Sequence, residues 1–425
     1  MKEHARPITR AWVIHPEIVG ADRARDPELA LEEAVLLAHA LPDLEVVGAQ
    51  VVRLRKPDAG RLFGKGKREE LKEAISAAEA DLVLVDGPLT PVQQRNLEKA
   101  WDIKILDRTG LILEIFSDRA ATREGVLQVE MAALSYQRTR LVRAWTHLER
   151  QRGGLGFVGG PGETQIEADR RAIDEQLVRL RRQLEKVVKT RTLHRAARAK
   201  VPFPIVALVG YTNAGKSTLF NRLTGADVMA KDMLFATLDP TMRRVVLPGG
   251  GAEVILSDTV GFISDLPTEL VAAFRATLEE VLEADLICHV RDISHPESAA
   301  QARDVATILE SLGVKDTVPQ IEIWNKIDRL EDETRAAAMT QAARQDGVQA
   351  LSAVTGQGID DLVAAVSQAL AEVRHLSDVH LGFDEGRKRA WLFQKDLVEE
   401  ERQTEDGFDL TVRWTVRQEQ QFEDM

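Results

Sequence analysis

The sequence predicts an α/β protein: two mostly parallel sheets with flanking helices are joined by a long helical hairpin and followed by a small α+β region. Short apolar segments alternate with helix-like segments over residues 1–118 and again over 201–372. Residues 119–200 hold two long helical stretches around a glycine-rich break, and residues 373–425 start a new strand pattern. With 44% hydrophobic residues, the 425-residue chain has enough apolar material for several cores.

The N-terminal region, residues 1–118, reads as a small parallel sheet flanked by helices. Arg53–Arg68 interrupts it with seven basic residues, one acid and three glycines. We interpret this segment as a flexible basic loop, either simply solvated or in contact with RNA phosphates. The expected strands are Trp12–Ile14, Glu45–Leu54, Asp81–Val85 and Lys104–Leu106, and the expected helices are Pro27–Ala40 and Val92–Trp101.

Residues 119–200 are expected to form a helical hairpin with a glycine-rich tip. Helix-like sequence covers Arg119–Arg152, stops at the glycines and proline of Arg152–Gly162, and resumes over Ile166–Lys200. Apolar residues at three- and four-residue spacing predict the seam between the two helices. The segment from Arg138 to Lys200 carries 16 basic against 7 acidic residues, so a basic arm is attached to a chain whose net charge is −12.

The same apolar patterns predict the elements of the second sheet and of the C-terminal region. Strands of the second region are expected at Ile205–Val209, Glu253–Ser257, Asp285–Val290 and Gln320–Trp324, with a short one at Val348–Leu351. The C-terminal α+β region is expected to have strands at Asp378–Phe383, Leu397–Arg402 and Phe408–Val416 and a helix at Gly386–Lys395.

A phosphate-binding loop lies between the strand Ile205–Val209 and a helix-like segment. The sequence from Gly210 to Ser217 fits G-x4-G-K-S, in which backbone N–H groups and a helix N-terminus surround phosphates. Lys216 is expected to neutralise the β- and γ-phosphates, and Ser217 to bind Mg²⁺. The expected nucleotide ligands here are Gly210, Tyr211, Thr212, Asn213, Ala214, Gly215, Lys216, Ser217 and Thr218.

Two further segments are expected beside the γ-phosphate. Asp258 follows a strand, and Gly261 lies three residues after it, so the Asp258 carboxylate would hold Mg²⁺ through water and the Gly261 N–H would contact the γ-phosphate. Thr237, in the segment that starts at Phe235, is placed to reach Mg²⁺, with Thr241 as a rival. Lys216, Thr237 and Gly261 are the expected catalytic residues, Ser217, Thr237 and Asp258 the metal ligands, and Phe235 a further nucleotide contact.

The base is expected to be guanine. Asn325-Lys326-Ile327-Asp328 follows a strand, and the Asp328 carboxylate can accept from guanine N1–H and the exocyclic amine, which adenine lacks. Asn325 would join this segment to the phosphate loop, and the Lys326 stem would cover the base. Ser352 and Ala353 follow the next strand, and the Ala353 N–H is a candidate donor to guanine O6. The ordered set predicts a P-loop GTPase domain that binds GTP or GDP with Mg²⁺.

The residue after Gly261 is Phe262, where many GTPases have a glutamine that orients the attacking water. A phenyl ring cannot do this, so intrinsic hydrolysis is expected to be slow. A partner, a K⁺ ion or another loop of the chain remain open as the source of the missing group.

Composition and terminal sequence exclude several classes of protein. Cys288 is the only cysteine and lies in an apolar run, so it is expected to be a buried, reduced thiol. No apolar stretch reaches the length of a membrane span, and Met1–Arg10 lacks the apolar core of a secretory signal. A cytoplasmic protein is therefore expected.

The chain resembles the HflX family of the Obg–HflX group over nearly its whole length. The most specific piece is the segment from Gly153 to Arg171, GGLGFVGGPGETQIEADRR. Further matches are Gly64–Lys67, Gln93–Glu98, Asp107–Thr109, Gly210–Asn221, Phe235–Thr241, Asp258–Ile263, and Gly386-Arg387 with Trp391-Leu392. One departure is Gly159, where several relatives carry arginine, which leaves the RNA contacts of the hairpin tip open.

The resemblance implies a GTPase that binds the large ribosomal subunit and its rRNA and splits ribosomes into subunits, notably under stress, with its N-terminal part reaching toward the peptidyl-transferase centre. It also implies weak ATP hydrolysis through the N-terminal region. We further expect a monomer when free, and association with ribosomes or the membrane periphery. The alternatives are a GTPase of large-subunit assembly and a protein- or membrane-associated regulatory switch whose hairpin binds a helical partner. The basic arm disfavours the switch.

Overall fold

The structure is a computed structural model that describes most of the chain. The chain divides into two compact units, residues 1–365 and 366–425, and each is described by itself. The described residues are 8–20, 25–151, 165–198, 203–226, 234–235, 241–247, 253–264, 279–314, 318–370, 375–395, 397–404, 406–414 and 416–423. The expected glycine-rich tip and Thr237 lie outside these ranges.

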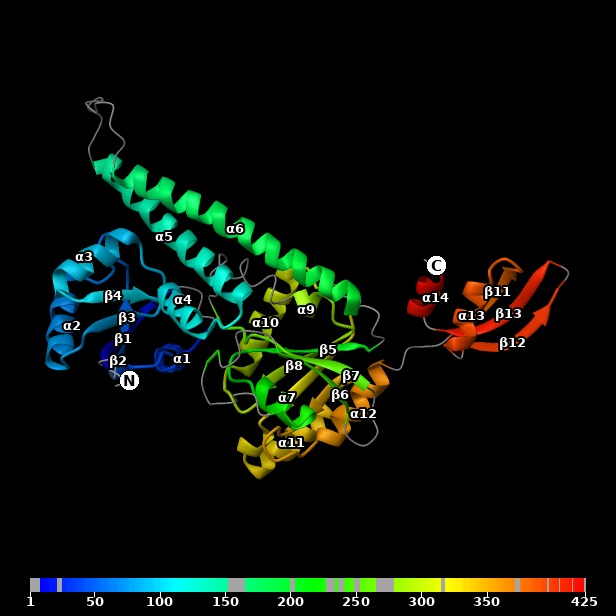
Figure 1. Ribbon diagram of the computed structural model, residues 1–425. Helices are drawn as coiled ribbons and strands as arrows, with labels where there is room; N and C mark the ends of the chain where they lie inside the picture. The colour runs from blue at the N-terminus through cyan, green and yellow to red at the C-terminus, as the bar shows by residue number, and fades with distance from the viewer. Residues whose placement is uncertain are drawn as a thin grey trace, which may run out of the picture. The chain divides into compact units, whose positions relative to one another are not determined.

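The N-terminal sheet has four parallel strands in the order β2-β1-β3-β4. Alternate residues of β1 face opposite layers: Val13 belongs to one apolar cluster, with Leu37 and Phe116, and Ile14 to another, with Leu71. Helices therefore cover both faces (Figure 1). The elements are β1 (Thr9–Ile18), α1 (Pro27–His39), β2 (Leu44–Leu54), α2 (Lys65–Ala77), β3 (Leu82–Val85), α3 (Pro91–Trp101), β4 (Lys104–Asp107) and α4 (Arg108–Arg119).

The expectation of a flexible loop over the whole of Arg53–Arg68 is wrong at both ends. Strand β2 continues to Leu54, and α2 begins at Lys65 after the N-cap residue Gly64. Phe63, next to the cap, is fully buried. The glycines suggested a loop, but the Lys, Arg and Glu residues that follow Gly64 are good helix formers.

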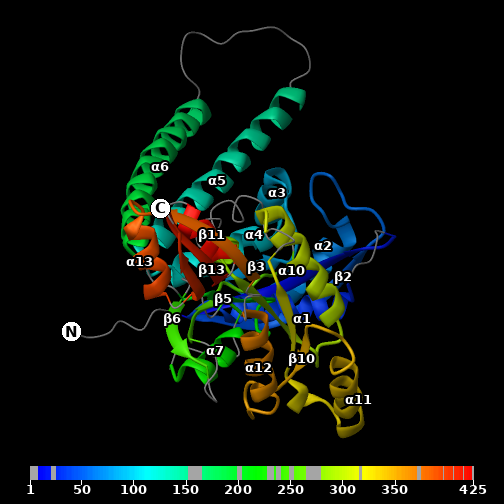
Figure 2. The same ribbon diagram turned by 90° about the vertical axis from the view of Figure 1, so that its right-hand side faces the viewer.

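The helical hairpin consists of α5 (Arg123–Gln151) and α6 (Gln165–Arg198). The Gln176 amide donates to Glu130 at 3.2 Å, and Arg138 pairs with Asp174 at 2.7 Å. The later residue of α5 thus contacts the earlier residue of α6, which means that the two helices run in opposite directions. The helices are antiparallel, as expected, and contact each other (Figure 1). Figure 2 shows that they diverge toward the end of α5 and the start of α6. The first begins at Arg123 rather than Arg119, because α4 extends to Arg119.

The second sheet has six strands in the order β10-β9-β8-β5-β7-β6, and only β6 runs antiparallel to its neighbour. Strand β6 was not expected, because its residues are mostly exposed and lack a clear alternation. The elements of this region are β5 (Ile205–Gly210), α7 (Lys216–Thr224), β6 (Thr241–Val246), β7 (Glu253–Asp258), α9 (Glu279–Leu282), β8 (Leu286–Asp292), α10 (Ser298–Leu312), β9 (Gln320–Asn325), η2 (Ile327–Arg329), α11 (Asp332–Ala342), β10 (Val348–Ala350) and α12 (Ile359–Leu370).

The C-terminal unit is a three-stranded antiparallel sheet in the order β11-β13-β12 with two helices. Its core includes Leu392, Trp414 and Phe422, and the last of these lies on a helix that was not expected. The elements are β11 (His375–Gly382), α13 (Gly386–Gln394), β12 (Val398–Gln403), β13 (Gly407–Trp414) and α14 (Val416–Glu423). Within the described residues, no helix is both long and apolar enough to cross a membrane.

Candidate functional site

The phosphate loop connects β5 to α7, and glycine is required at two of its positions. Gly210 has φ +153°, and a Cβ there would lie 2.2 Å from the Val290 carbonyl oxygen. Gly215 has φ +97°, and its Cβ would lie 2.2 Å from Asn325 Nδ2. The loop therefore approaches the neighbouring strands more closely than any side chain allows, and α7 begins at Lys216 with its N-terminus at the loop.

Lys216 is a buried cation at the start of α7. Its Nζ donates to the carbonyl oxygens of Gly210 at 3.1 Å and Tyr211 at 2.9 Å. Complete burial lowers the pKa of Lys216 to about 8, although the carboxylate of Asp258 acts in the opposite direction. A cation that is held out of water in this way is suited to an anionic ligand, which restores the lost solvation.

Ser217 and Asp258 come together from two elements, as the metal prediction requires. The Ser217 hydroxyl donates to Asp258 Oδ2 at 2.7 Å, and Asp258 is fully buried at the end of β7. A hydroxyl and a carboxylate are the hard oxygen ligands that Mg²⁺ takes beside nucleotide phosphates. The residues fit that ion, and its binding here stays a prediction. Thr237, the third expected ligand, lies outside the described residues.

Asn325 joins the segment that is expected to bind the base, Asn325–Asp328, to the phosphate loop. Its Nδ2 donates to the Ala214 carbonyl at 2.8 Å, and its Oδ1 accepts from the Ala353 N–H at 3.0 Å. The first bond was expected from the sequence. The second was not, and it occupies the N–H that was expected to contact guanine O6. The guanine contact of Ala353 stays a prediction.

Asp328 and Lys326 lie beside this bridge. Asp328 Oδ1 is buried and has no hydrogen-bond partner among the described residues, so it can accept from guanine N–H groups. Lys326 Nζ forms an ion pair with Asp292 Oδ2 at 2.8 Å, with both side chains largely buried. This pair holds the Lys326 stem in place. Sequence reasoning missed Asp292, which ends β8 without any motif.

The remaining expected ligands have the following surroundings. Thr212 is buried, and its Oγ1 has no partner in the described part of the chain. Ser352 is fully buried and accepts from the Thr355 N–H at 3.1 Å. The Phe235 ring is buried against Phe116, so this arrangement gives it no free face for a nucleotide.

Phe262 is packed into the core, with 2% of its surface exposed. Its backbone pairs with the phosphate loop: its N–H donates to the Gly210 carbonyl at 3.1 Å, and its carbonyl accepts from the Thr212 N–H at 2.7 Å. Gly261 lies so close that a Cβ there would be 2.9 Å from Thr212 Cα and 3.1 Å from Lys216 Nζ. The segment Gly261–Phe262 is therefore held against the loop by its backbone.

Two residues of β8 need no role in the chemistry. Cys288 is a buried free thiol, as expected, and burial raises its pKa to about 12. His289 is a strand residue whose pKa is lowered by burial to about 4, so its ring is neutral near pH 7.

Comparison with known proteins agrees with this geometry. A family model described as "50S ribosome-binding GTPase" matches residues 205–326, and one described as "HflX C-terminal domain" matches 337–424. Models described as "GTP-binding GTPase N-terminal" and "GTP-binding GTPase Middle Region" match residues 28–117 and 119–198.

Curated relatives match over most of their length. A protein named GTPase HflX from Magnetococcus marinus is 51% identical over 90% of this chain and 87% of its own. The protein of the same name from Escherichia coli is 46% identical over 85% and 84%. Among solved structures, a GTP-binding protein from Sulfolobus solfataricus in complex with GDP is 22% identical, covers 85% of this chain and 98% of its own, and has a TM-score of 0.45.

The fold and the site define a P-loop GTPase, a protein that binds guanosine nucleotides and hydrolyses GTP. The chain belongs to the HflX family of these GTPases.

Proposed function

We propose that the protein uses GTP to bind the large ribosomal subunit and to split ribosomes into subunits. The proposal rests on α6, on which the seven exposed basic residues named below outnumber the four exposed acidic residues Glu167, Asp169, Glu175 and Glu185. Its seam residues Leu177 and Leu180 are buried, whereas its basic residues from Arg170 to Lys189 are exposed. A helix surface on which exposed cations outnumber exposed anions suits the phosphates of rRNA. The exposed basic residues are Arg170, Arg171, Arg179, Arg181, Arg182, Lys186 and Lys189.

The nucleotide site would act as the switch for this binding. Mg²⁺, when bound by Ser217, Asp258 and Thr237, would neutralise phosphate charge. Lys216 would stabilise the charge that develops on the transferred phosphoryl group, and the Gly261 N–H would contact the γ-phosphate. Asp328 would select guanine. Since Phe262 is packed in the core, the group that orients water would come from a partner, from K⁺ or from another loop.

Three finer points belong to the same proposal. Location in the cytoplasm and a monomeric free state stay predictions. Weak ATP hydrolysis through residues 1–118 also stays a prediction, carried by the family resemblance.

The test is sedimentation of mature ribosomes on sucrose gradients with the protein and either a non-hydrolysable GTP analogue or GDP. We expect ribosomes to separate into subunits with the analogue and to stay intact with GDP. Binding only to immature large subunits would favour the assembly alternative. Intact ribosomes and no binding with either nucleotide would contradict the proposal.

A matched pair of variants tests the role of α6. Arg179→Gln with Arg182→Gln is expected to weaken ribosome binding about tenfold at constant salt, because two phosphate contacts are lost. Arg344→Gln with Arg402→Gln removes the same charge from exposed positions outside α6 and should change binding less than about twofold. Equal losses in the two double variants would show that only total charge matters.

A further inference from the structure

Arg222 links the helix of the phosphate loop to the segment that follows β10. Its Nε donates to the Ala353 carbonyl at 2.5 Å, and its Nη2 donates to the Val354 carbonyl. Arg222 lies on α7, which begins at Lys216, and 131 positions separate it from Ala353 in the chain. One guanidinium group therefore holds two successive carbonyl groups of the other segment.

That segment, residues 351–358, is called the β10 loop below, and its own hydrogen bonds hold it in one shape. The Gly356 N–H donates to the Ser352 carbonyl at 2.8 Å, and the Ser352 N–H donates to the Gln357 carbonyl at 2.9 Å. A Cβ on Gly356 would lie 2.8 Å from Arg222 Nη1. The guanidinium group thus packs directly on the backbone of the loop.

The β10 loop lies beside the segment that is expected to bind the base. Strands β9 and β10 are parallel, so the segments that follow them leave the sheet at the same edge, where ligands of such sheets bind. The Ile327 N–H donates to the Leu351 carbonyl at 3.4 Å, and Asp328 follows Ile327 directly. If Asp328 accepts from guanine N1–H, the neighbouring O6 needs a donor, and the β10 loop is close by.

The peptide group between Ala353 and Val354 offers such a donor. The Ala353 N–H is already taken by Asn325 Oδ1 at 3.0 Å, whereas the Val354 N–H has no acceptor among the described residues. A trans peptide group is planar, so its N–H points away from its carbonyl. Because Arg222 holds the Ala353 carbonyl, it also fixes the direction of the Val354 N–H.

We propose that Arg222 is a positioning residue for base recognition: it holds the peptide group between Ala353 and Val354 so that the Val354 N–H donates to guanine O6. The charge of the guanidinium strengthens both of its hydrogen bonds. Its fork also reaches two carbonyls at once, which a lysine cannot do. The proposal deepens the expected guanosine site, requires that Asp328 bind the base, and is independent of ribosome splitting.

The first test measures equilibrium binding of GDP and of 6-thio-GDP, in which sulfur replaces O6, to the full chain. Sulfur accepts hydrogen bonds more weakly, so we expect the wild type to prefer GDP about fivefold. Arg222→Met removes the donors and keeps the length of an exposed side chain. It should weaken GDP binding about fivefold and 6-thio-GDP binding less than about twofold. Equal weakening of both nucleotides would indicate a general loosening of the site and would overturn the proposal, as would a wild type that does not distinguish them.

Two further variants and a third nucleotide are the controls. Arg344→Met removes the same charge from an exposed position whose side chain has no polar partner in the described part of the chain, and GDP affinity should change less than about twofold. Arg222→Lys keeps the charge without the fork, so its GDP affinity should be intermediate. Inosine diphosphate keeps O6 and lacks only the exocyclic amine, so Arg222→Met should weaken it by the same factor as GDP. No loss in Arg222→Met, or an equal loss in Arg344→Met, would overturn the proposal.

The second test removes the N–H itself. The Val354 side chain is 66% exposed and its φ is not positive, so proline can delete the donor with little change in packing. Val354→Pro should lose the preference for GDP over 6-thio-GDP and keep the preference for GDP over ADP, which rests on Asp328. Thermal unfolding checks that the variant folds, and the Arg222→Met comparison decides if it does not. A preference for GDP over 6-thio-GDP that survives Val354→Pro would overturn this proposal alone, whereas a wild type without preference for GDP over ADP would overturn the guanosine site itself.

Discussion

Asp107 ends a strand of the N-terminal sheet, Asp258 ends a strand of the second sheet, and both residues are buried. Asp107 accepts from the Gly110 N–H at 2.9 Å, from Arg140 at 3.2 Å and from the Tyr136 hydroxyl. Its surroundings are protein donors that cap α4 and hold α5. Asp258 instead meets the hydroxyl of Ser217 at the phosphate loop. A carboxylate at a strand end is therefore structural where the chain's own cations and N–H groups surround it, and a candidate ligand where it faces a glycine loop and a helix N-terminus.

This comparison predicts that substitutions beside the second sheet reduce GTP hydrolysis more than any others. Lys216→Ala should reduce GTP hydrolysis by about a thousandfold, because it removes the cation that stabilises transition-state charge. Because burial disfavours the charge of Lys216, the fold should lose little stability. Single-turnover hydrolysis and thermal unfolding of the same sample measure both. A variant that is much less stable than the wild type but, while folded, hydrolyses GTP at the wild-type rate would reverse the comparison.

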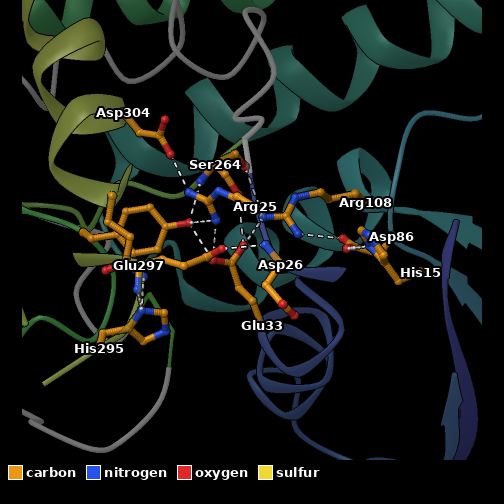
Figure 3. Close-up of polar contacts among 12 residues, drawn as sticks. His15, Arg25, Asp26, Glu33, Asp86, Arg108, Ser264, His295, Glu297 and Asp304 are labelled. Carbon is orange, nitrogen blue, oxygen red and sulfur yellow. Dashed lines mark hydrogen bonds and ion pairs between the residues drawn. The ribbon is translucent and has the colours of Figure 1, made fainter. Parts of the chain in front are cut away.

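Substitution of a buried carboxylate beside the N-terminal sheet should lower the free energy of unfolding and leave nucleotide binding unchanged. Asp86 is paired with Arg108 at 2.6 Å and with His15 at 2.7 Å (Figure 3). Asp86→Asn leaves buried Arg108 without one of its two carboxylates, so we expect a loss of about 3 kcal/mol in the free energy of unfolding at pH 7. GDP affinity should be unchanged. Denaturant unfolding and GDP titration would check these two quantities, and a weakened GDP affinity with full stability would count against the account.

The same residue predicts a pH dependence. Burial alone would raise the pKa of Asp86, but the charge of Arg108 and the hydrogen bonds from His15 and Arg108 lower it. The ionised form is thus favoured by folding. The stabilisation is complete above the usual aspartate pKa of about 4 and is lost as the pH falls below it. Unfolding of Asp86→Asn should therefore depend less on acid pH than that of the wild type.

A smaller effect is expected at Asn325. Asn325→Ala removes the link between Ala214 and Ala353 and leaves their buried backbone groups unpaired. We expect GDP to bind about tenfold more weakly, the cost of one or two hydrogen bonds. Isothermal titration against the wild type measures it, and an unchanged affinity would show that the two segments hold their places without the bridge.

The smallest effect is expected at Phe262. Phe262→Leu keeps an apolar side chain in the core position and leaves the backbone bonds to Gly210 and Thr212 available. Hydrolysis should change by less than about threefold, because volume-conserving core changes are well tolerated. A loss comparable with that of Lys216→Ala would mean that the ring itself takes part in the chemistry.

The sequence predicted the phosphate loop and most strands and helices, because each of them is determined by residues that are close together in the chain. The phosphate loop, the strands before it and the helix after it follow from glycine spacing and apolar runs, and Asn325 was correctly expected to bond the loop. The exposed strand β6 lacks a clear alternation, and the glycines around Lys65 obscured the start of α2. The hydrogen bond between Tyr211 and Glu33 could not be predicted, because the two residues are 178 positions apart and the phosphate-loop pattern leaves the residue type at position 211 open.

The central claim is that Asp328 and Lys216 bind opposite ends of one guanosine nucleotide. Competition between GDP and ADP for the full-length protein with Mg²⁺ tests it most directly, with Asp328→Asn measured in parallel. We expect the wild type to prefer GDP by at least about a hundredfold, because adenine leaves a buried carboxylate unpaired, and the variant to lose that preference. Equal affinity of the wild type for both nucleotides, or a preference that survives Asp328→Asn, would contradict the account.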